Sequence, residues 1–91
     1  MLRPQDESLM ETPEIRLKRL KMRSMRRGIK EMDILLSRFA DARLAGLSAG
    51  DLDLYERLLD ENDQDLLAWV TGREAAPDWI SAMIFEIRAT A

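Results

Sequence analysis

The sequence predicts an all-α protein, a single domain built as a small five-helix bundle. Apolar residues recur with helical spacing in five separate segments. No stretch alternates apolar and polar residues with the period of a strand, and no Asn-Gly or Asp-Gly pair marks a hairpin. Ninety-one residues can build only one thin hydrophobic core. We therefore expect a helical domain at residues 13–91, behind a flexible N-terminal tail at residues 1–12.

The first helix is predicted at residues 13–26. Thr12 is a favourable N-cap, and Pro13 suits the first helical position. Ile15, Met22, Met25 and Ile29 are expected to share one face, which can be incompletely packed or can offer apolar surface to a partner. Leu17 and Leu20 fall off that stripe, so the helix is only weakly amphipathic. We expect a monomer. If these two leucines are exposed, they can support a weak dimer.

The second helix, residues 29–44, has the strongest periodicity in the chain and is expected to be the central core helix. Its apolar residues keep a 3-4-3 spacing at Ile29, Met32, Leu36 and Phe39. Gly46 follows as a stop signal.

Three shorter helices are expected to complete the bundle. One follows a capping sequence at Ser48 and runs to about Leu59. The next is capped by Asn62 or Asp63 and stops at residues 71–72. In it, Asp63, Asp65 and Trp69 are read as a cap, a first-turn acid and a core aromatic. The last helix is expected to begin near Pro77 and end near Arg88.

Composition restricts the chemistry that this chain can perform. It has no cysteine and no histidine, so it lacks a thiolate nucleophile, a Cys-ligated metal and the usual general base. We expect no enzyme, no metal site and no stably bound cofactor. No apolar run is long enough for membrane insertion. The N-terminus lacks a secretory signal, and its acidic residues argue against a mitochondrial presequence, so a cytoplasmic location is expected.

Charge is distributed unevenly along the chain. Residues 1–30 contain nine basic and four acidic residues, a net charge of +5, whereas residues 31–91 contain five basic and thirteen acidic residues, a net charge of −8. The basic helix can be a solvated face partly paired with the acidic helices, a nucleic-acid contact, or a protein interface. Overall acidity and the lack of aromatic residues among the arginines argue against nucleic acid.

The segment at the junction of the first two helices is the strongest candidate site. Glycine in a helix interior costs about 0.5–1 kcal/mol relative to alanine, so Gly28 indicates a turn or a close backbone approach. Arg27 and Glu31 place opposite charges on either side of it. An ion pair between them within one helix would contribute only about 0.2–0.5 kcal/mol. We therefore favour a partner-binding role.

Two segments resemble a known family. The first reads Arg26-Arg27-Gly28-Ile29-Lys30-Glu31-Met32-Asp33, and the second comprises Tyr55–Leu59 and Asp63–Gly72. In this order they resemble the SdhE / succinate dehydrogenase assembly factor 2 family, the flavinators. That family carries an Arg-Gly-x-x-Glu motif and a later Leu-Leu-acid-x-x-Asp-x-Asp-Leu-x-x-Trp pattern.

The resemblance implies an assembly factor that binds the flavoprotein subunit of succinate dehydrogenase, and the related fumarate reductase flavoprotein as a further client. It also implies that this factor promotes covalent attachment of FAD to the client. Both the FAD and the histidine that links it belong to the client. The partner-binding residues that the family motif implies in this chain are Arg27, Gly28 and Glu31. The extended form of the motif adds Arg26 and Asp33. Without a presequence, the chain resembles a bacterial member. A small antitoxin-like nucleic-acid regulator that uses the basic first helix is the alternative.

Overall fold

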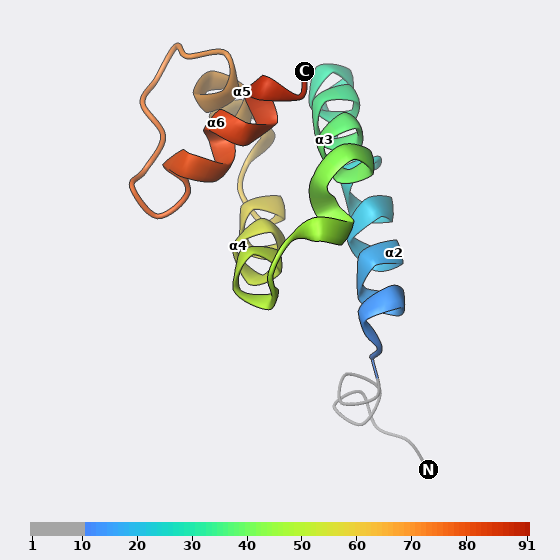
Figure 1. Cartoon of the computed structure of the whole chain (residues 1–91). Coiled ribbons are helices and arrows are strands. Elements are labelled where there is room, and N and C mark those ends of the chain that lie inside the picture. The colour runs from blue at the N-terminus through green and yellow to red at the C-terminus, as the bar shows by residue number, and fades with distance from the viewer. Residues whose placement is uncertain (1–10) are drawn as a thin grey trace.

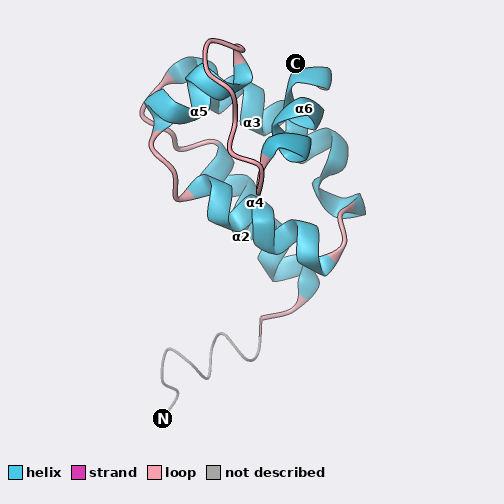
Figure 2. Ribbon diagram, turned by 90° about the vertical axis from the view of Figure 1, so that its left-hand side faces the viewer, coloured by secondary structure: helices cyan, strands magenta, loops and turns pink. Residues whose placement is uncertain are grey.

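The computed structural model describes residues 11–91, which form α-helices, one short 3-10 helix and no strand, and it confirms the predicted all-α fold (Figure 1, Figure 2). The elements are α2 (Pro13–Ser24), α3 (Lys30–Arg43), η1 (Leu44–Gly46), α4 (Ala49–Leu59), α5 (Asp63–Val70) and α6 (Ser81–Ala89). The expected tail falls outside the described residues except for Glu11 and Thr12. Between residues 11 and 91, no helix has the length and apolar character needed to cross a membrane.

Side-chain capping sets the start of three helices. In each case a side-chain oxygen of the capping residue accepts a backbone N–H from the first turn of the helix. The cap is Thr12 for α2, at 3.2 Å, Ser48 for α4, at 3.1 Å, and Asn62 for α5, at 2.8 Å. Of the two candidates for the cap of α5, Asn62 fills the position. The carboxylate of Asp63, the first residue of α5, is therefore able to contact another part of the chain.

The last helix begins later than the sequence predicted. Pro77 starts a turn instead, in which its carbonyl accepts the Ile80 N–H at 3.1 Å. The Ser81 hydroxyl then donates to the Asp78 carbonyl at 3.3 Å. The helix starts at Ser81, after this turn has ended.

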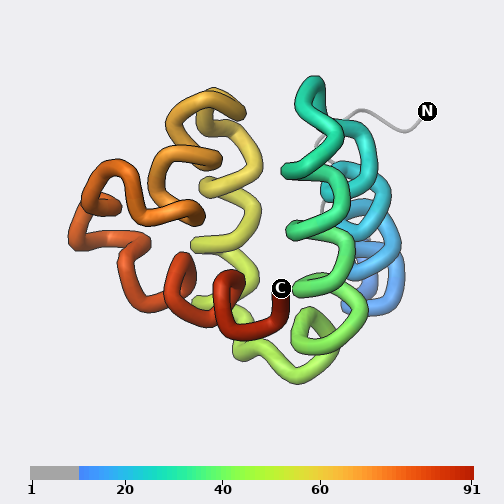
Figure 3. Tube along the Cα trace, turned by 90° about the horizontal axis from the view of Figure 1, so that it is seen from above, coloured from blue at the N-terminus to red at the C-terminus, as the bar shows by residue number. Residues whose placement is uncertain are grey.

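Helix α3 is the central core helix, as predicted. It packs against α2, α5 and α6, and four of its residues are buried: Met32, Leu36, Phe39 and Ala40. The Phe39 ring packs against the ring of Tyr55 from α4, with their centroids 5.4 Å apart. Seen along the view of Figure 3, α3 stands beside α4 near the middle of the molecule.

Most of the apolar stripe predicted on the first helix faces solvent. Ile15, Met22 and Met25 are 53%, 50% and 57% exposed, whereas Leu20 and Ser24 are completely buried and Leu17 is half-buried. A serine can occupy this core position because its hydroxyl donates to the Leu20 carbonyl at 2.8 Å and shares a hydrogen bond with the Tyr55 hydroxyl at 2.5 Å. Because Leu20 packs inside the fold, it offers no surface for the expected weak dimer.

Candidate functional site

The corner between α2 and α3, residues 25–29, forms a tight change of direction. Met25 closes the last turn of α2, and Ile29 is extended and starts α3 without a side-chain cap. The Asp33 carboxylate reaches back from the first turns of α3 and accepts the Arg27 backbone N–H at 2.5 Å. Asp33, expected to contact a partner, thus has a contact inside the chain that fixes the corner.

The Arg27 side chain lies inside the fold and connects this corner to the turn between α4 and α5. Its Nε donates to Asp63 Oδ1 at 2.6 Å, and its two Nη groups donate to the carbonyls of Leu59 and Glu61 at 2.5 and 2.9 Å. These carbonyls belong to the end of α4 and the turn after it, where helix geometry leaves them without partners. Only 10% of the Arg27 side chain is exposed. Its guanidinium therefore binds within the chain, contrary to the expectation that it reaches a partner.

Gly28 is exposed at the tip of the corner, and its N–H donates to Asp63 Oδ2 at 2.7 Å. A Cβ atom at this position would lie 3.3 Å from that oxygen, which is tight. The close approach predicted from the glycine thus involves this chain's own carboxylate. Asp63 binds the two consecutive residues Arg27 and Gly28, one through each carboxylate oxygen.

The remaining motif residues point outward. Arg26 and Glu31 are exposed, as is Lys30 between them. Within residues 11–91, no ion pair joins any of these three side chains to another residue. The corner therefore presents charges of both signs on a backbone that Arg27 holds in place.

A mixed apolar and basic groove of about 620 Å³ runs along α2 toward this corner. Its apolar lining comes from Ile15 and Met22, and its basic lining includes Lys18 and Arg26. Met25, also exposed, is the first residue of the corner, at the end of the same helix. A solvent-exposed stripe of large apolar residues beside charged ones is typical of a protein-interaction surface.

All three arginines of α2 face the acidic residues of α4 and the turn after it. Arg16 donates to Asp53 at 2.5 Å and to Glu56 at 3.2 Å, Arg19 donates to Glu56 at 2.8 Å, and Arg23 donates to Asp60 at 2.7 Å. This row of pairs is the α2–α4 ion-pair ladder. Because these arginines are paired within the fold, they are less able to bind nucleic acid.

The ladder shifts the titration of its members. The hydrogen bond from Arg19, together with that from Arg16, lowers the pKa of Glu56. Hydrogen bonds to Glu11 and then Glu56 raise the pKa of Arg19. Both shifts favour the charged forms of Arg19 and Glu56.

The part of the chain that the structure describes contains no group of three or more acidic side chains placed to hold a metal ion. The residues described here form a basic and apolar groove that leads to a charged corner.

Sequence reasoning placed Gly28, Glu31 and Arg26 correctly at an exposed junction, but it missed the role of Asp63. That residue was interpreted as a cap, although it joins the two segments that carry the family resemblance. The sequence signal that could have revealed this contact was the presence of two unusual motifs in one short chain. Because 36 residues separate Arg27 from Asp63, the sequence did not indicate that the two residues are in contact.

Comparisons with known proteins indicate the same family as the sequence resemblance. Residues 18–91 match the profile of a family described as flavinator of succinate dehydrogenase. Curated relatives include proteins named succinate dehydrogenase assembly factor 2, mitochondrial. The Schizosaccharomyces pombe protein is 43% identical over 84% of this chain and 55% of its own length. The Schizosaccharomyces japonicus protein is 39% identical over 92% of this chain and 59% of its own length. The Debaryomyces hansenii protein is 48% identical over 67% of this chain and 43% of its own length.

This chain thus spans about half the length of the curated relatives it matches. The expected cytoplasmic location is wrong in the light of these matches, because the relatives are fungal proteins whose names place them in mitochondria. For the same reason, the comparisons do not support the expected bacterial origin. Acidic residues near the N-terminus were a poor guide to location.

Proposed function

The chain belongs to the family of flavinators of succinate dehydrogenase, and we propose that it assists assembly of that enzyme by binding its flavoprotein subunit and promoting covalent attachment of FAD. The observation that carries this proposal is the geometry of the α2–α3 corner. Arg27 is tied into the fold by three hydrogen-bonding groups, while Gly28 and Glu31 remain exposed.

The surface proposed to meet the client is the corner together with the groove along α2. Glu31 supplies a carboxylate for a client arginine or lysine, and Arg26 supplies a cation for a client carboxylate. The exposed Met22 and Met25 provide adaptable apolar contact between these charges. The bare backbone at Gly28 lets a client segment come close.

The protein acts without catalytic groups of its own. It has neither histidine nor cysteine, and family membership favours a helper role over an enzymatic one. A helper raises the rate of flavin attachment if it binds more tightly to the client conformation that brings flavin and linking histidine together. FAD is the cofactor of the client and is not held stably by this chain.

We include the fumarate reductase flavoprotein as a second client in this proposal. A rigid corner recognises local charge and shape, so any flavoprotein with the same local surface can dock on it. The two clients then compete for one site with a stoichiometry of one to one.

The test is flavinylation in a purified system. The apo-flavoprotein subunit of succinate dehydrogenase is incubated with FAD, with and without this protein, and covalent flavin is read as fluorescence on a denaturing gel. The expected result is a higher rate of flavin attachment and a one-to-one complex on gel filtration. An unchanged rate together with no complex for either flavoprotein would contradict the proposal.

A further inference from the structure

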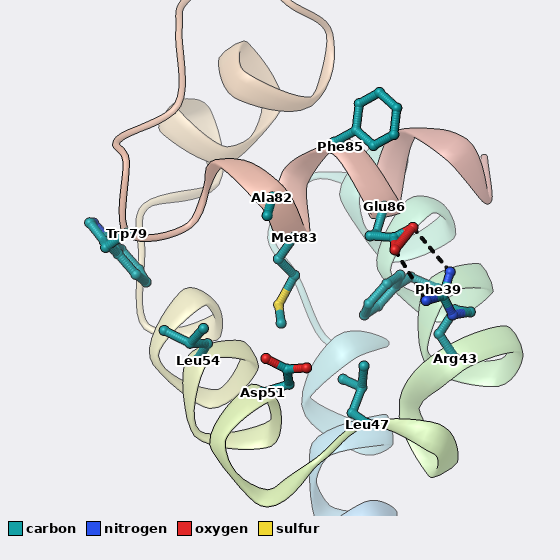
Figure 4. A pocket seen from close by; sticks show the side chains of 10 residues that line it. All are labelled: Phe39, Arg43, Leu47, Asp51, Leu54, Trp79, Ala82, Met83, Phe85 and Glu86. Carbon is teal, nitrogen blue, oxygen red and sulfur yellow. Dashed lines mark hydrogen bonds and ion pairs between the residues drawn. The ribbon is translucent and has the colours of Figure 1, made fainter.

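A second hollow lies between α3, α4 and α6, away from the corner described above (Figure 4). Its volume is about 380 Å³, large enough for an apolar side chain. The apolar wall is formed by Leu47, Leu54 and Trp79, and the Met83 side chain points into the space between them (Figure 4). We call this hollow the α6 cleft.

Charge at the α6 cleft is not balanced. On one wall, Arg43 donates to both carboxylate oxygens of Glu86, at 3.1 and 3.2 Å, so that these two charges offset each other. On the other side, the Asp51 carboxylate faces the cleft (Figure 4). Asp51 forms no ion pair with any residue between 11 and 91. The cleft therefore combines an apolar interior with the Asp51 carboxylate, and the nearby Arg57 guanidinium stacks on the Trp79 ring, 4.0 Å from its centroid, without forming an ion pair with Asp51.

Phe85 stands at the rim and is 68% exposed, more than any other large apolar residue in the described part of the chain. Its ring points away from the α6 cleft in Figure 4. It also lines another hollow of about 370 Å³, together with Gly72 and Arg88. An aromatic side chain between two hollows can be covered by one extended or helical segment lying across α6.

We propose that the α6 cleft and Phe85 form a second docking site, for a partner polypeptide segment that carries apolar side chains next to a lysine or arginine. One apolar side chain enters the cleft against Met83, another covers Phe85, and the basic group pairs with Asp51. Charge complementarity selects this occupant, because the Asp51 carboxylate that faces the cleft has no ion-pair partner among residues 11–91.

This site is separate from the one proposed for the flavoprotein. Figure 3 shows α6 and the α2–α3 corner at opposite sides of the molecule. One molecule can therefore hold two partner segments at once, and loss of binding at one site leaves the other intact.

The probes are three short synthetic peptides of equal length. The first combines leucine and phenylalanine with lysine, the second replaces lysine with glutamate, and the third keeps lysine but replaces the apolar residues with serine. Binding is followed by NMR on the whole protein, with the Trp79 indole N–H as reporter of the cleft. Only the first peptide should bind saturably, with shifts centred on α6 and the start of α4.

Variants locate the contacts. Asp51→Asn should weaken binding of the first peptide by about fivefold, as expected for a partly exposed ion pair. Asp65→Asn is the matched control: it removes the same charge at the third residue of α5, as Asp51 is the third residue of α4, and should leave binding unchanged. Phe85→Ser should weaken binding by about tenfold or more, as loss of an aromatic anchor does. Glu31→Gln should have no effect.

Four outcomes would overturn the proposal. The acidic and basic apolar peptides could bind equally well, the lysine–serine peptide could bind as tightly as the first, or shifts could centre on α2. Self-association that occupies the cleft, seen as concentration-dependent shifts without peptide and abolished by Phe85→Ser, would assign the surface to a second copy and also overturn it.

Discussion

Asp63 at the start of α5 holds Arg27 from the α2–α3 corner, with 2.6 Å between Oδ1 and Nε, and its other oxygen accepts the N–H of Gly28 at 2.7 Å. Two segments far apart in the sequence thus meet at one carboxylate. Arg27 and Asp63, whose side chains lie largely inside the fold, fix the corner. They thereby position the exposed residues Gly28 and Glu31. This division separates the effect of each residue on stability from its effect on binding.

Removing the Asp63 carboxylate should destabilise the fold. Asp63→Asn leaves the largely buried Arg27 without its counter-charge, and the expected loss in free energy of unfolding is about 3 kcal/mol. Urea denaturation followed by circular dichroism measures it. Asp65→Asn, another first-turn acid of α5 but exposed, should change stability by less than about 0.5 kcal/mol. Equal stability of the two variants would show that the Arg27–Asp63 pair contributes little.

The apolar residues of α2 should matter for binding and not for folding. The double variant Met22→Gln with Met25→Gln replaces side chains that are 50% and 57% exposed, so stability should change by less than about 1 kcal/mol. Affinity for the flavoprotein subunit, measured by calorimetry, should fall about tenfold through lost apolar contact. Phe85→Ser is the control, since it removes an exposed apolar residue far from the corner. Equal loss with Phe85→Ser would place the client elsewhere.

Tyr55 should make the protein sensitive to alkali. Burial raises the pKa of its hydroxyl to about 12, against about 10 in an unfolded chain. Above pH 10 the unfolded state loses this proton while the folded state keeps it, so stability falls as pH rises from 10 to 12, by about 2–3 kcal/mol in total. Denaturation of the wild type and Tyr55→Phe across this range gives the measurement.

The Tyr55→Phe variant should lack this part of the pH dependence. It should also be about 1 kcal/mol less stable at pH 7, because the hydrogen bond to Ser24 is lost. Parallel slopes for the two proteins between pH 10 and 12 would contradict the assignment.

Glu56 should contribute stability that depends on acid and salt. Its pKa is lowered by the hydrogen bond from Arg19, so its contribution is present above the unfolded pKa and is lost as pH falls through the folded value. Glu56→Gln should cost about 1 kcal/mol at pH 7 and low salt, and less in 1 M salt, where partly exposed pairs are screened. The matched control is Glu14→Gln on α2. A difference from wild type that is the same at pH 3 and pH 7 would argue against a charged ladder.

The sequence was sufficient for the fold class, the order of helices and the central place of α3, because capping residues and apolar spacing act locally. It did not establish which face of α2 lies inward. Ser24 of that helix is in the core, where the Tyr55 hydroxyl and the Leu20 carbonyl satisfy its hydroxyl. A hydrogen bond between helices cannot be read from the spacing of residues within one helix.

The candidate site was predicted in position and only partly in detail. The glycine and the charges around it marked an exposed corner, and the structure places Gly28 and Glu31 there. The inward direction of Arg27 could not be predicted, because its partners come from α4, α5 and the turn between them. Long-range pairs of this kind depend on how the helices pack, which local patterns do not specify.

The central claim is that Arg27 maintains the corner while Glu31 meets the client. It is tested most directly by the affinity of the purified flavoprotein subunit for Glu31→Gln and for Glu14→Gln, measured alongside urea denaturation. Each carboxylate is the exposed second residue of its helix, so the two variants alter helix electrostatics alike. Both should be as stable as wild type, and only Glu31→Gln should bind about tenfold or more weakly, through loss of a charge-assisted contact. Wild-type affinity for Glu31→Gln, or an equal loss for both variants, would contradict the claim.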